Sequence, residues 1–300
     1  MPLASLIIPT CNRPADLRRC LELLAPQWPA DGSVELIVTD DGADEQACEI
    51  IAQVLPAAKW LRGPRRGPAS NRNAAAKAAA GSWLIFLDDD CQPTENYLAA
   101  YLVSIREAPK YCGIIEGSTR RDPTPPSLLW EAPETLRFHG HLTCSCNFAI
   151  RADIFHAMDG FDHRYAGGVY AEDTDFSARL SRAGYQMTFE PRAMVVHPLR
   201  PIPGAAKLAK RWEGKVIFAF DQGASALTVA WRLPWHVLRV IQSRFRHQRL
   251  SLENLRAAFR FAGEWFLVVL HTPGWVKKWS TAPRSSFWEI GRGHVPKFGF

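Results

Sequence analysis

The stretch LIFLDDD, residues Leu84–Asp90, joins an apolar run of strand length directly to three carboxylates. Three adjacent negative charges repel one another, so a positive group is expected nearby, and hard divalent cations such as Mg²⁺ and Mn²⁺ prefer carboxylate oxygens. The carboxyl end of a strand is also where open α/β folds bind ligands. Because side chains alternate along a strand, we expect Asp88 and Asp90 to share one side and one ion. The structural alternative is an acidic turn before a helix that starts near Thr94 and Glu95.

The chain before this stretch alternates between strand and helix patterns. The order β-α-β-α-β-α-β predicts a mainly parallel sheet with helices on both faces. A second strand, Val34–Thr39, also runs into carboxylates, Asp40 and Asp41. Parallel neighbours end at one edge of a sheet, so these groups and Asp88–Asp90 should open together. The pattern therefore predicts a crevice for a nucleotide and a metal ion at that edge.

The second half of the chain is less regular. We expect a helix over 95–107 and one over 176–183 that follows the carboxylates Glu172 and Asp173. Apolar alternation predicts strands at 113–117, 143–150, 187–191 and 193–197.

Length and composition fit one large domain with an appendage. The 300 residues are 47% hydrophobic and 22% charged, which is enough for a full core. We expect the large domain to span residues 1–200. No apolar run reaches the length of a membrane span, and no signal peptide is recognised. The seven scattered cysteines fit reduced thiols and a cytoplasmic location.

Charge is distributed unevenly along the chain. Residues 1–199 carry 19 basic and 25 acidic side chains, whereas residues 200–300 carry 17 and 5, so the net charges are −6 and +12. Seven of the 11 tryptophans lie after residue 200. Residues 201–300 are therefore expected to form a basic, tryptophan-rich, mainly helical extension.

Several short motifs occur together in a familiar order. They are Ile8-Pro9-Thr10-x-Asn12-Arg13, Val38-Thr39-Asp40-Asp41-Gly42, Ala69-x-x-Arg72-Asn73, Phe86-Leu87-Asp88-Asp89-Asp90, Asn147-Phe148-Ala149-Ile150-Arg151, Gly160-Phe161-Asp162, Ala171-Glu172-Asp173, Arg182-Ala183-Gly184-Tyr185 and the strand that ends in His197. Through these motifs the chain resembles, over about residues 4–200, a family 2 glycosyltransferase with the GT-A fold. The resemblance implies a catalytic domain over 1–200, with a nucleotide-sugar half at about 1–117 and an acceptor half at about 118–200.

The resemblance implies a metal-assisted transfer of a sugar from a nucleotide-diphosphate sugar. A divalent cation, Mn²⁺ or Mg²⁺, would bridge the phosphates. Asp90 would be the main metal ligand, with Asp88 at the ribose or the metal and His197 as a further ligand. For His197 a purely structural hydrogen bond is the alternative. Nucleotide contacts are expected from Pro9, Thr10, Asn12, Arg13, Asp41, Arg72, Asp88 and Asp89.

The donor base is expected to be uracil or thymine, so UDP or dTDP is favoured over GDP. Many relatives carry a stacking aromatic residue at the position of Cys11, and a thiol cannot stack in that way. Base affinity and base identity are therefore the least defined parts of the donor site.

The acceptor hydroxyl holds its proton at neutral pH, so a carboxylate must remove it during attack. By resemblance Asp173 is the base and Glu172 orients it or the acceptor. A single displacement by one base inverts the anomeric centre. The alternative is that the pair only favours the start of a helix. The acceptor is expected to be a saccharide or a lipid-linked saccharide.

The extension suggests further contacts. Arg211 and Trp212 resemble a segment that some relatives use near the diphosphate or the acceptor. Trp231, Trp235 and Leu238 share a helix with arginines, a composition typical of an interfacial helix on anionic lipid, so peripheral attachment to the inner membrane face is expected. A second apolar stripe is expected to pack on the catalytic domain; its members are Leu252, Leu255, Phe259 and Phe266.

Two other classes remain open from the sequence. One is a catalytically inactive module with the same fold that docks on a membrane through its basic tail. The other is a nucleotidyltransferase, which would need a glycine-rich basic loop after the first strand, where this chain has Thr10-Cys11-Asn12-Arg13. Nucleic-acid binding is not expected, because the basic excess is confined to the tail and no nucleic-acid motif is present.

Overall fold

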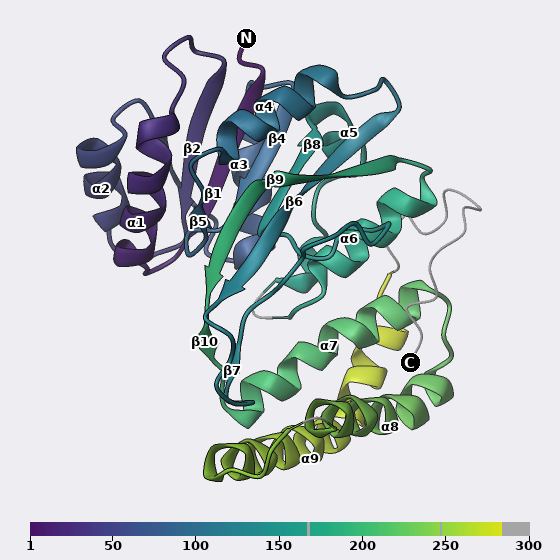
Figure 1. Cartoon of the computed structure of the whole chain (residues 1–300). Coiled ribbons are helices and arrows are strands. Elements are labelled where there is room, and N and C mark those ends of the chain that lie inside the picture. Colours follow the sequence, from purple (N-terminus) through teal and green to yellow (C-terminus); the bar gives the residue numbers. More distant parts are fainter. Residues whose placement is uncertain (167–168, 247, 284–300) are drawn as a thin grey trace.

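The computed structural model describes residues 1–166, 169–246 and 248–283. An eight-stranded sheet lies between two layers of helices, and a group of three helices is attached at one end (Figure 1). The sheet order is β3-β2-β1-β4-β8-β6-β9-β5. The expected GT-A type fold, a mixed and mainly parallel sheet flanked by helices, is confirmed.

The first half of the chain forms a parallel βα repeat. Strands β1, β2, β3 and β4 pair in parallel. Their bounds and those of the intervening helices are β1 (Ala4–Thr10), α1 (Pro14–Leu24), the 3-10 turn η1 (Ala25–Gln27), β2 (Val34–Asp40), α2 (Gln46–Val54), β3 (Lys59–Arg62), α3 (Pro68–Ala78) and β4 (Trp83–Leu87).

The second half closes the sheet with mixed pairing. Strand β8 is antiparallel to both β4 and β6, and β6 is parallel to β9. The elements are β5 (Gln92–Pro93), α4 (Tyr97–Glu107), β6 (Cys112–Asp122), β7 (Trp130–Glu131), β8 (Asn147–Arg151), α5 (Ala152–Ala157), the 3-10 turn η2 (His163–Tyr165), α6 (Glu172–Arg182), β9 (Gln186–Pro198) and β10 (Arg200–Pro201).

Strand alternation divides the core between the two faces of the sheet. Leu6, Leu36 and Ile85 point to one face, where they join α1, α2 and α4. Ile7 and Phe86 point to the other, where Phe86 stacks on Phe148 with ring centroids 4.9 Å apart. Burial of both faces explains why these strands are continuous apolar runs.

Several expected boundaries differ from the structure. The two strands expected at 187–191 and 193–197 are one strand, β9, in which the register to β6 jumps between Gly117 and Ser118 because extra residues around Pro191 bulge out. Strand β8 begins at Asn147 rather than at 143. The helix expected over 176–183 already begins at Glu172, so the paired carboxylates occupy its first turn.

The helices α7 (Ala205–Asp221), α8 (Ala226–Phe245) and α9 (Leu252–Ser280) form what we call the helical extension. They bury a core of their own that includes Val216, Leu233 and Phe261. None of the helices in the described part of the chain is long and apolar enough to cross a bilayer. Residues 284–300 of the expected extension lie outside the described residues.

One expectation about the extension is wrong. The stripe Leu252, Leu255, Phe259 and Phe266 does not pack on the catalytic domain but is exposed to solvent. The side of α9 that packs inward carries instead Asn254, Ala257, Phe261, Glu264 and Val268. Two of these, Asn254 and Glu264, are polar, so the packed face does not form a regular apolar pattern in the sequence.

Candidate active site

The loops at the carboxyl ends of β1, β2 and β4 meet at one edge of the sheet, as the sequence predicted. Strand β1 lies between β2 and β4 and is parallel to both. Asn12 and Arg13 follow β1, Asp41 follows β2, and Asp88–Asp90 follow β4. The edge therefore gathers acidic and basic side chains from three loops, as expected for a crevice that binds a charged ligand.

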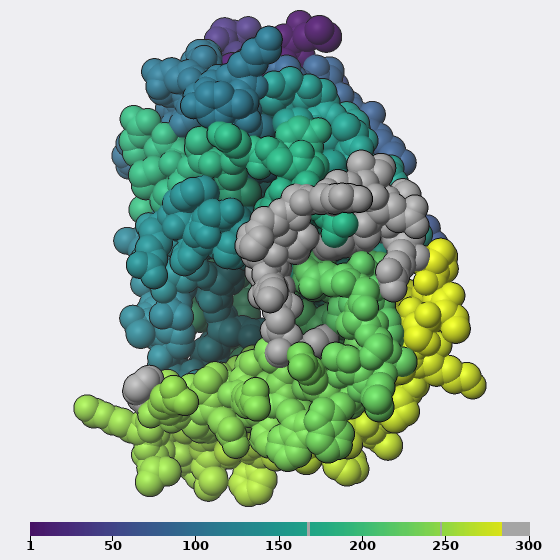
Figure 2. Space-filling view, turned by 90° about the vertical axis from the view of Figure 1, so that its right-hand side faces the viewer, coloured from purple at the N-terminus to yellow at the C-terminus, as the bar shows by residue number. Residues whose placement is uncertain are grey.

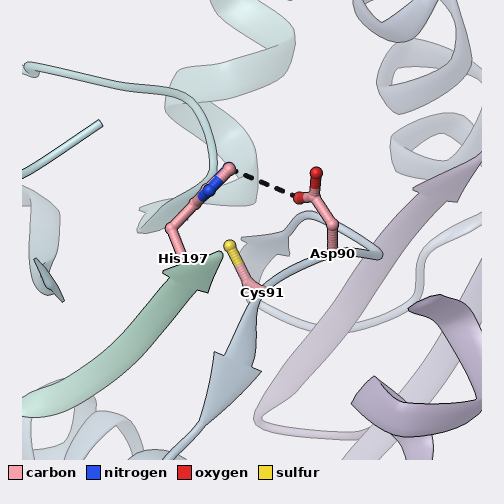
Figure 3. A group of neighbouring side chains, drawn as sticks. All are labelled: Asp90, Cys91 and His197. Carbon is pink, nitrogen blue, oxygen red and sulfur yellow. Dashed lines mark ion pairs between the residues drawn. The ribbon is translucent and has the colours of Figure 1, made fainter. Parts of the chain in front are cut away.

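Asp90 and His197 face each other across this edge (Figure 3). Asp90 Oδ1 lies 3.5 Å from His197 Nε2, and both residues are buried. The His197 Nδ1 atom lies 2.9 Å from the carbonyl oxygen of Pro198. A carbonyl only accepts, so Nδ1 carries the proton, and in the neutral ring the Nε2 lone pair points toward Asp90. A second contact that fixes the tautomer is typical of a metal-binding histidine.

The donor atoms in this group fit a divalent cation. Asp90, Cys91 and His197 bring ligand atoms within 4.8 Å of one another. Adjacent ligands of one octahedral ion lie about 3 Å apart, which is close to the spacing of Asp90 Oδ1 and His197 Nε2. Cys91 is a poorer ligand: its hydrogen bond with Cys146 favours the thiolate, but burial and nearby carboxylates outweigh that effect and raise its thiol pKa to about 12.

Two arginines neutralise the other oxygen of Asp90. Arg13 Nη1 lies 3.1 Å from Asp90 Oδ2, and Arg200 Nη2 lies 3.2 Å from the same atom. Arg200 also donates to Asp16 Oδ2 at 2.6 Å. Sequence reasoning missed Arg200; its position three residues after His197 was the available signal. The pair of guanidinium groups beside a metal-type carboxylate can bind a diphosphate.

Asp89 is directed into the protein rather than toward solvent. It accepts hydrogen bonds from the Thr10 hydroxyl at 2.7 Å and from Arg13 at 3.2 Å. Burial raises the pKa of Asp89 to about 7, although Arg13 and Thr10 oppose this rise. Asp89 thus joins the loops after β1 and β4, which is a supporting role for the donor site.

Asp88 and Asp90 both lie beyond the end of the strand and contact different side chains. Strand β4 stops at Leu87, so the alternation from which the two were expected to share a side does not extend to them. Asp88 Oδ1 instead forms a short ion pair with Arg72 Nη2. In the described part of the chain, the ion pairs of Arg72 are with Asp88 and Glu172.

Arg72 links the donor edge to the helix that carries Glu172. Its guanidinium is buried on α3, over the ring of Phe161, and its Nη1 lies 3.8 Å from Glu172 Oε1. Among the described residues, the Nε and Nη1 atoms of Arg72 have no hydrogen-bond partner. Unused donors on a buried cation are costly unless something accepts from them, so this group is suited to an anionic ligand.

Glu172 and Asp173 occupy the first turn of α6 after a strained residue. Ala171 has φ 90°, a conformation that L residues seldom adopt. Burial and the adjacent Asp173 raise the pKa of Glu172 to about 7, against the opposing effect of Arg72. Asp173 Oδ1 accepts from Thr174 N at 2.6 Å. The two carboxylates are thus in different environments, as a base and its orienting neighbour require.

The loops that carry the expected base contacts are held by side chains. Asp41 accepts from the backbone N–H groups of Arg65 and Gly67, at 2.9 and 3.0 Å. Asn12 has a left-handed backbone, φ 54°, and its Oδ1 accepts from Ala43 N at 3.2 Å. Pro9 is buried within β1. Asp41 and Asn12 thereby fix the three loops around the expected position of the base.

The side chains of Arg211 and Trp212 contact different parts of the protein. Arg211 pairs with Glu131 at 2.6 Å and lies over the ring of Tyr170, close to the helix that bears Glu172. Trp212 Nε1 donates to Glu264 of α9 at 2.7 Å. Trp212 is therefore directed into the helical extension, whereas Arg211 lies beside the segment that precedes α6.

Helix α7 supports the start of α6 directly. A side chain at Gly214 would place its Cβ 1.5 Å from the carbonyl oxygen of Tyr170, so only glycine permits this approach. Lys215 Nζ lies 3.5 Å from the hydroxyl of Thr174; burial lowers its pKa, and the charge of Asp173 opposes this. Lys215 was also missed, since nothing in a sequence shows which helix packs on α6.

A further ion pair joins the same two parts of the chain. Arg164 of η2 donates to Asp162 and to Asp221 at the end of α7, both at 2.6 Å. The segment before α6 is thus held by α7 at Tyr170 and through Arg164.

The fold and the edge residues together define an α/β protein whose charged loops meet at the carboxyl ends of its parallel strands, and comparison with known proteins gives the family. The model of "Glycosyl transferase family 2" matches residues 5–158, just over half of the chain. The chain therefore belongs to glycosyl transferase family 2, whose members are sugar-transferring enzymes.

Curated relatives carry the same class of name. The glycosyltransferase AglE of Haloferax volcanii is 25% identical over 213 residues, which cover 67% of this chain and 68% of the relative. The pre-mycofactocin glycosyltransferase of Mycobacterium tuberculosis is 28% identical over 213 residues, or 65% of this chain and 43% of the relative. The match thus spans less than half of that second protein.

Solved structures show the same fold. TarS of S. aureus, residues 1–349 in complex with UDP-GlcNAc, superposes with a TM-score of 0.58 at 16% identity and covers 94% of this chain and 90% of its own. The mannosyltransferase PcManGT of Pyrobaculum calidifontis, in complex with GDP-Man and Mn²⁺, gives 0.51 at 16% identity, covering 96% and 78%.

The contact between α7 and Tyr170 can be tested with one methyl group. We expect Gly214→Ala to displace the segment before Glu172 and to lower transfer activity about 10- to 100-fold, because misplacement of reacting groups by about 1 Å has effects of that size. Gly274→Ala in α9, where no atom lies within 4 Å of the added Cβ, is the matched control. It should leave activity unchanged; equal losses in both variants would contradict the contact.

The environment of Glu172 predicts a pH dependence of stability. The pKa is about 7 in the folded chain against 4.5 as the ordinary value. Between these values the folded state binds more protons than the unfolded state, so stability falls as the pH rises. Relative to Glu172→Gln, the unmodified protein should lose roughly 3 kcal/mol between pH 4.5 and pH 7.5. Urea unfolding in EDTA without nucleotide measures the free energy of unfolding of both proteins at each pH. If this free energy depends on pH in the same way in the two proteins, the pKa of Glu172 is not raised in the folded chain.

Proposed function

We propose that the chain is an inverting, metal-assisted glycosyltransferase that moves a sugar from a nucleotide-diphosphate sugar to a hydroxyl acceptor. The observation that carries this proposal is the buried contact of Arg72 with both Asp88 and Glu172. It connects the donor edge of the sheet to the helix that supplies the base. Family membership supports the class of reaction, and the placement of the carboxylates supports the roles given below.

The donor diphosphate would lie at the edge formed by Arg13, Arg200 and Asp90. Asp41, Pro9, Thr10 and Asn12 would surround the base and ribose. Solved relatives are recorded with UDP-GlcNAc and with GDP-Man. For this chain we propose UDP or dTDP before GDP. Cys11 is exposed at the start of the loop, where it offers no ring for stacking.

Asp90 and His197 would hold a divalent cation, Mn²⁺ or Mg²⁺. Such an ion neutralises the diphosphate as it leaves the sugar. The protein's own groups would share that task, because Arg13 and Arg200 lie on the other oxygen of Asp90. PcManGT, which shares the fold, is recorded with Mn²⁺, which supports a cation at this site. Asp88, held by Arg72, would contact the ribose or a metal-bound group.

Asp173 would take the proton of the acceptor hydroxyl while the oxygen attacks the anomeric carbon. Glu172, set by Arg72, would keep the first turn of α6 in position and order the acceptor. A single displacement without a covalent intermediate gives a product with the opposite anomeric configuration. The acceptor is proposed to be a saccharide or a lipid-linked saccharide. No contact in the described residues favours the alternative of an inactive binding module.

Mutation can distinguish the proposed role of Asp173 as the base from a role in stabilising the start of a helix. Asp153 makes the same local hydrogen bond in α5, where its Oδ1 accepts from Ile154 N at 2.9 Å. Asp173→Asn should lower the rate of transfer by about 10²- to 10⁴-fold, as removal of a general base does, with donor binding retained. Asp153→Asn should leave the rate unchanged. Release of nucleoside diphosphate measures the rate, and NMR of the product gives the anomeric configuration; a retained configuration would contradict the mechanism.

The proposed metal site predicts which nucleotide stabilises the protein and that this stabilisation requires a metal ion. A ligand that binds only the folded state raises its melting temperature. We expect UDP or dTDP to do so strongly with Mn²⁺ or Mg²⁺, and Asp90→Asn to remove the dependence on metal. Asp16→Asn is the matched control, because Asp16 shares Arg200 with Asp90 but lies outside the ligand group. A metal-dependent shift that survives in Asp90→Asn would place the ion elsewhere.

A further inference from the structure

We propose that the outer face of the helical extension binds an anionic lipid surface. We define this outer face as the exposed apolar side chains of α8 and α9 together with the arginines beside them. Its members are Leu227, Trp231, Trp235, Leu252, Leu255, Phe259, Phe266 and Leu270, with Arg232, Arg239, Arg246 and Arg256. The proposal does not depend on the transfer chemistry.

The stripe on α9 is narrow and continuous. At about 100° per residue, Leu252, Leu255, Phe259, Phe266 and Leu270 fall within roughly 60° of arc, along roughly 27 Å of helix. Phe259 is 73% exposed and Phe266 61%. The buried residues of α9 lie on the opposite side and pack against α7 and α8. The helix is thus apolar on two opposite sides, of which its own fold covers only one.

Helix α8 adds tryptophan and positive charge. Trp231 is 69% exposed and Trp235 52%, although the same helix buries Val229, Leu233 and Val237. Arg232 and Arg239 are exposed and lie next to the tryptophans around the helix, and Arg246 follows at its end. The helix Ala226–Phe245 contains no acidic residue. Exposed aromatic rings flanked by arginine are the composition of a helix that lies in a membrane interface.

Helices α8 and α9 lie at one end of the molecule, on the side of α7 that faces away from the sheet. Figure 1 shows α8 and α9 side by side below α7, and in Figure 2 their side chains form the lower end of the molecule. Neither the catalytic domain nor α7 covers this end. A flat partner could therefore contact both helices at once.

The charges favour lipid over other partners. A second copy of the chain on this face would bring two sets of arginines together, and like charges in a low-dielectric contact repel. A nucleic acid would pair with the arginines but leave the apolar stripe in water. An anionic bilayer satisfies both, since phosphate groups take the arginines and the acyl boundary takes the rings.

The test is co-sedimentation of the full chain with vesicles of phosphatidylcholine alone or mixed with phosphatidylglycerol. We expect binding to the mixed vesicles that weakens as salt rises. Replacement of Trp231, Trp235, Phe259 and Phe266 by alanine together should lower partitioning at least about tenfold. Each of Arg232→Gln, Arg239→Gln and Arg246→Gln should lower it about fivefold on the anionic vesicles. These side chains are exposed, and thermal unfolding verifies that each variant is folded.

The control removes exposed aromatic rings from the catalytic domain instead. Tyr111 and Phe138 are 66% and 48% exposed, and Tyr111→Ala with Phe138→Ala should bind vesicles as the unmodified protein does. Three results would overturn the proposal: no binding to anionic vesicles, equal loss in the control, or binding unchanged by the fourfold alanine variant. A fourth result would also overturn it. If the protein does not bind vesicles but forms a dimer in sedimentation analysis, and the fourfold alanine variant abolishes that dimer, the face binds a second copy of the chain.

Discussion

The buried guanidinium of Arg72 is the contact on which the arrangement of the active site depends. Asp88 and Glu172 come from segments far apart in the sequence, and their charges would repel across a partly dry space. Arg72 lies between them and contacts both. Removal of such a cation would leave two carboxylates without compensation in a low-dielectric setting. The start of α6, with its strained Ala171, can therefore stay close to the end of β4 because of one side chain on α3.

The same principle holds for the rest of the edge. Asp90 is balanced by Arg13 and Arg200, and Asp89 by Arg13 and the Thr10 hydroxyl. The carboxylates proposed to bind a metal ion are thus kept apart by arginines that could also bind phosphates. Because each arginine contacts a carboxylate, a ligand meets side chains that are already oriented. Oriented charge of this kind lowers the reorganisation that transfer requires.

Sequence reasoning succeeded where local pattern determines structure. The βα repeat and the convergence of Asp41 with Asp88–Asp90 followed from apolar strands that end in carboxylates. It failed where a contact is made between distant segments. The roles of Arg200 and Lys215 arise from the paths of β9 and α7, and the only local signal was the position of Arg200 three residues after His197. The outward stripe of α9 was misassigned because Asn254 and Glu264 lie on the packed side, so the more regular apolar pattern belonged to the exposed side.

The helical extension connects the segment before α6 to the exposed outer helices. Its inner helix, α7, contacts Tyr170 through Gly214 and holds Arg164 through Asp221, and so sets the segment that leads to Glu172 and Asp173. Its outer helices present aromatic rings and arginines. The strands β6 and β9 point toward this extension in Figure 1, and β1, β2 and β4 run in the same direction, so the carboxyl edge with the active site is the edge nearest to it. The extension that carries the proposed lipid-binding face therefore lies beside the edge that gathers the charged side chains. Helix α7 packs against α9 as well as against the segment before α6, so one helix connects the proposed lipid-binding face to Glu172 and Asp173.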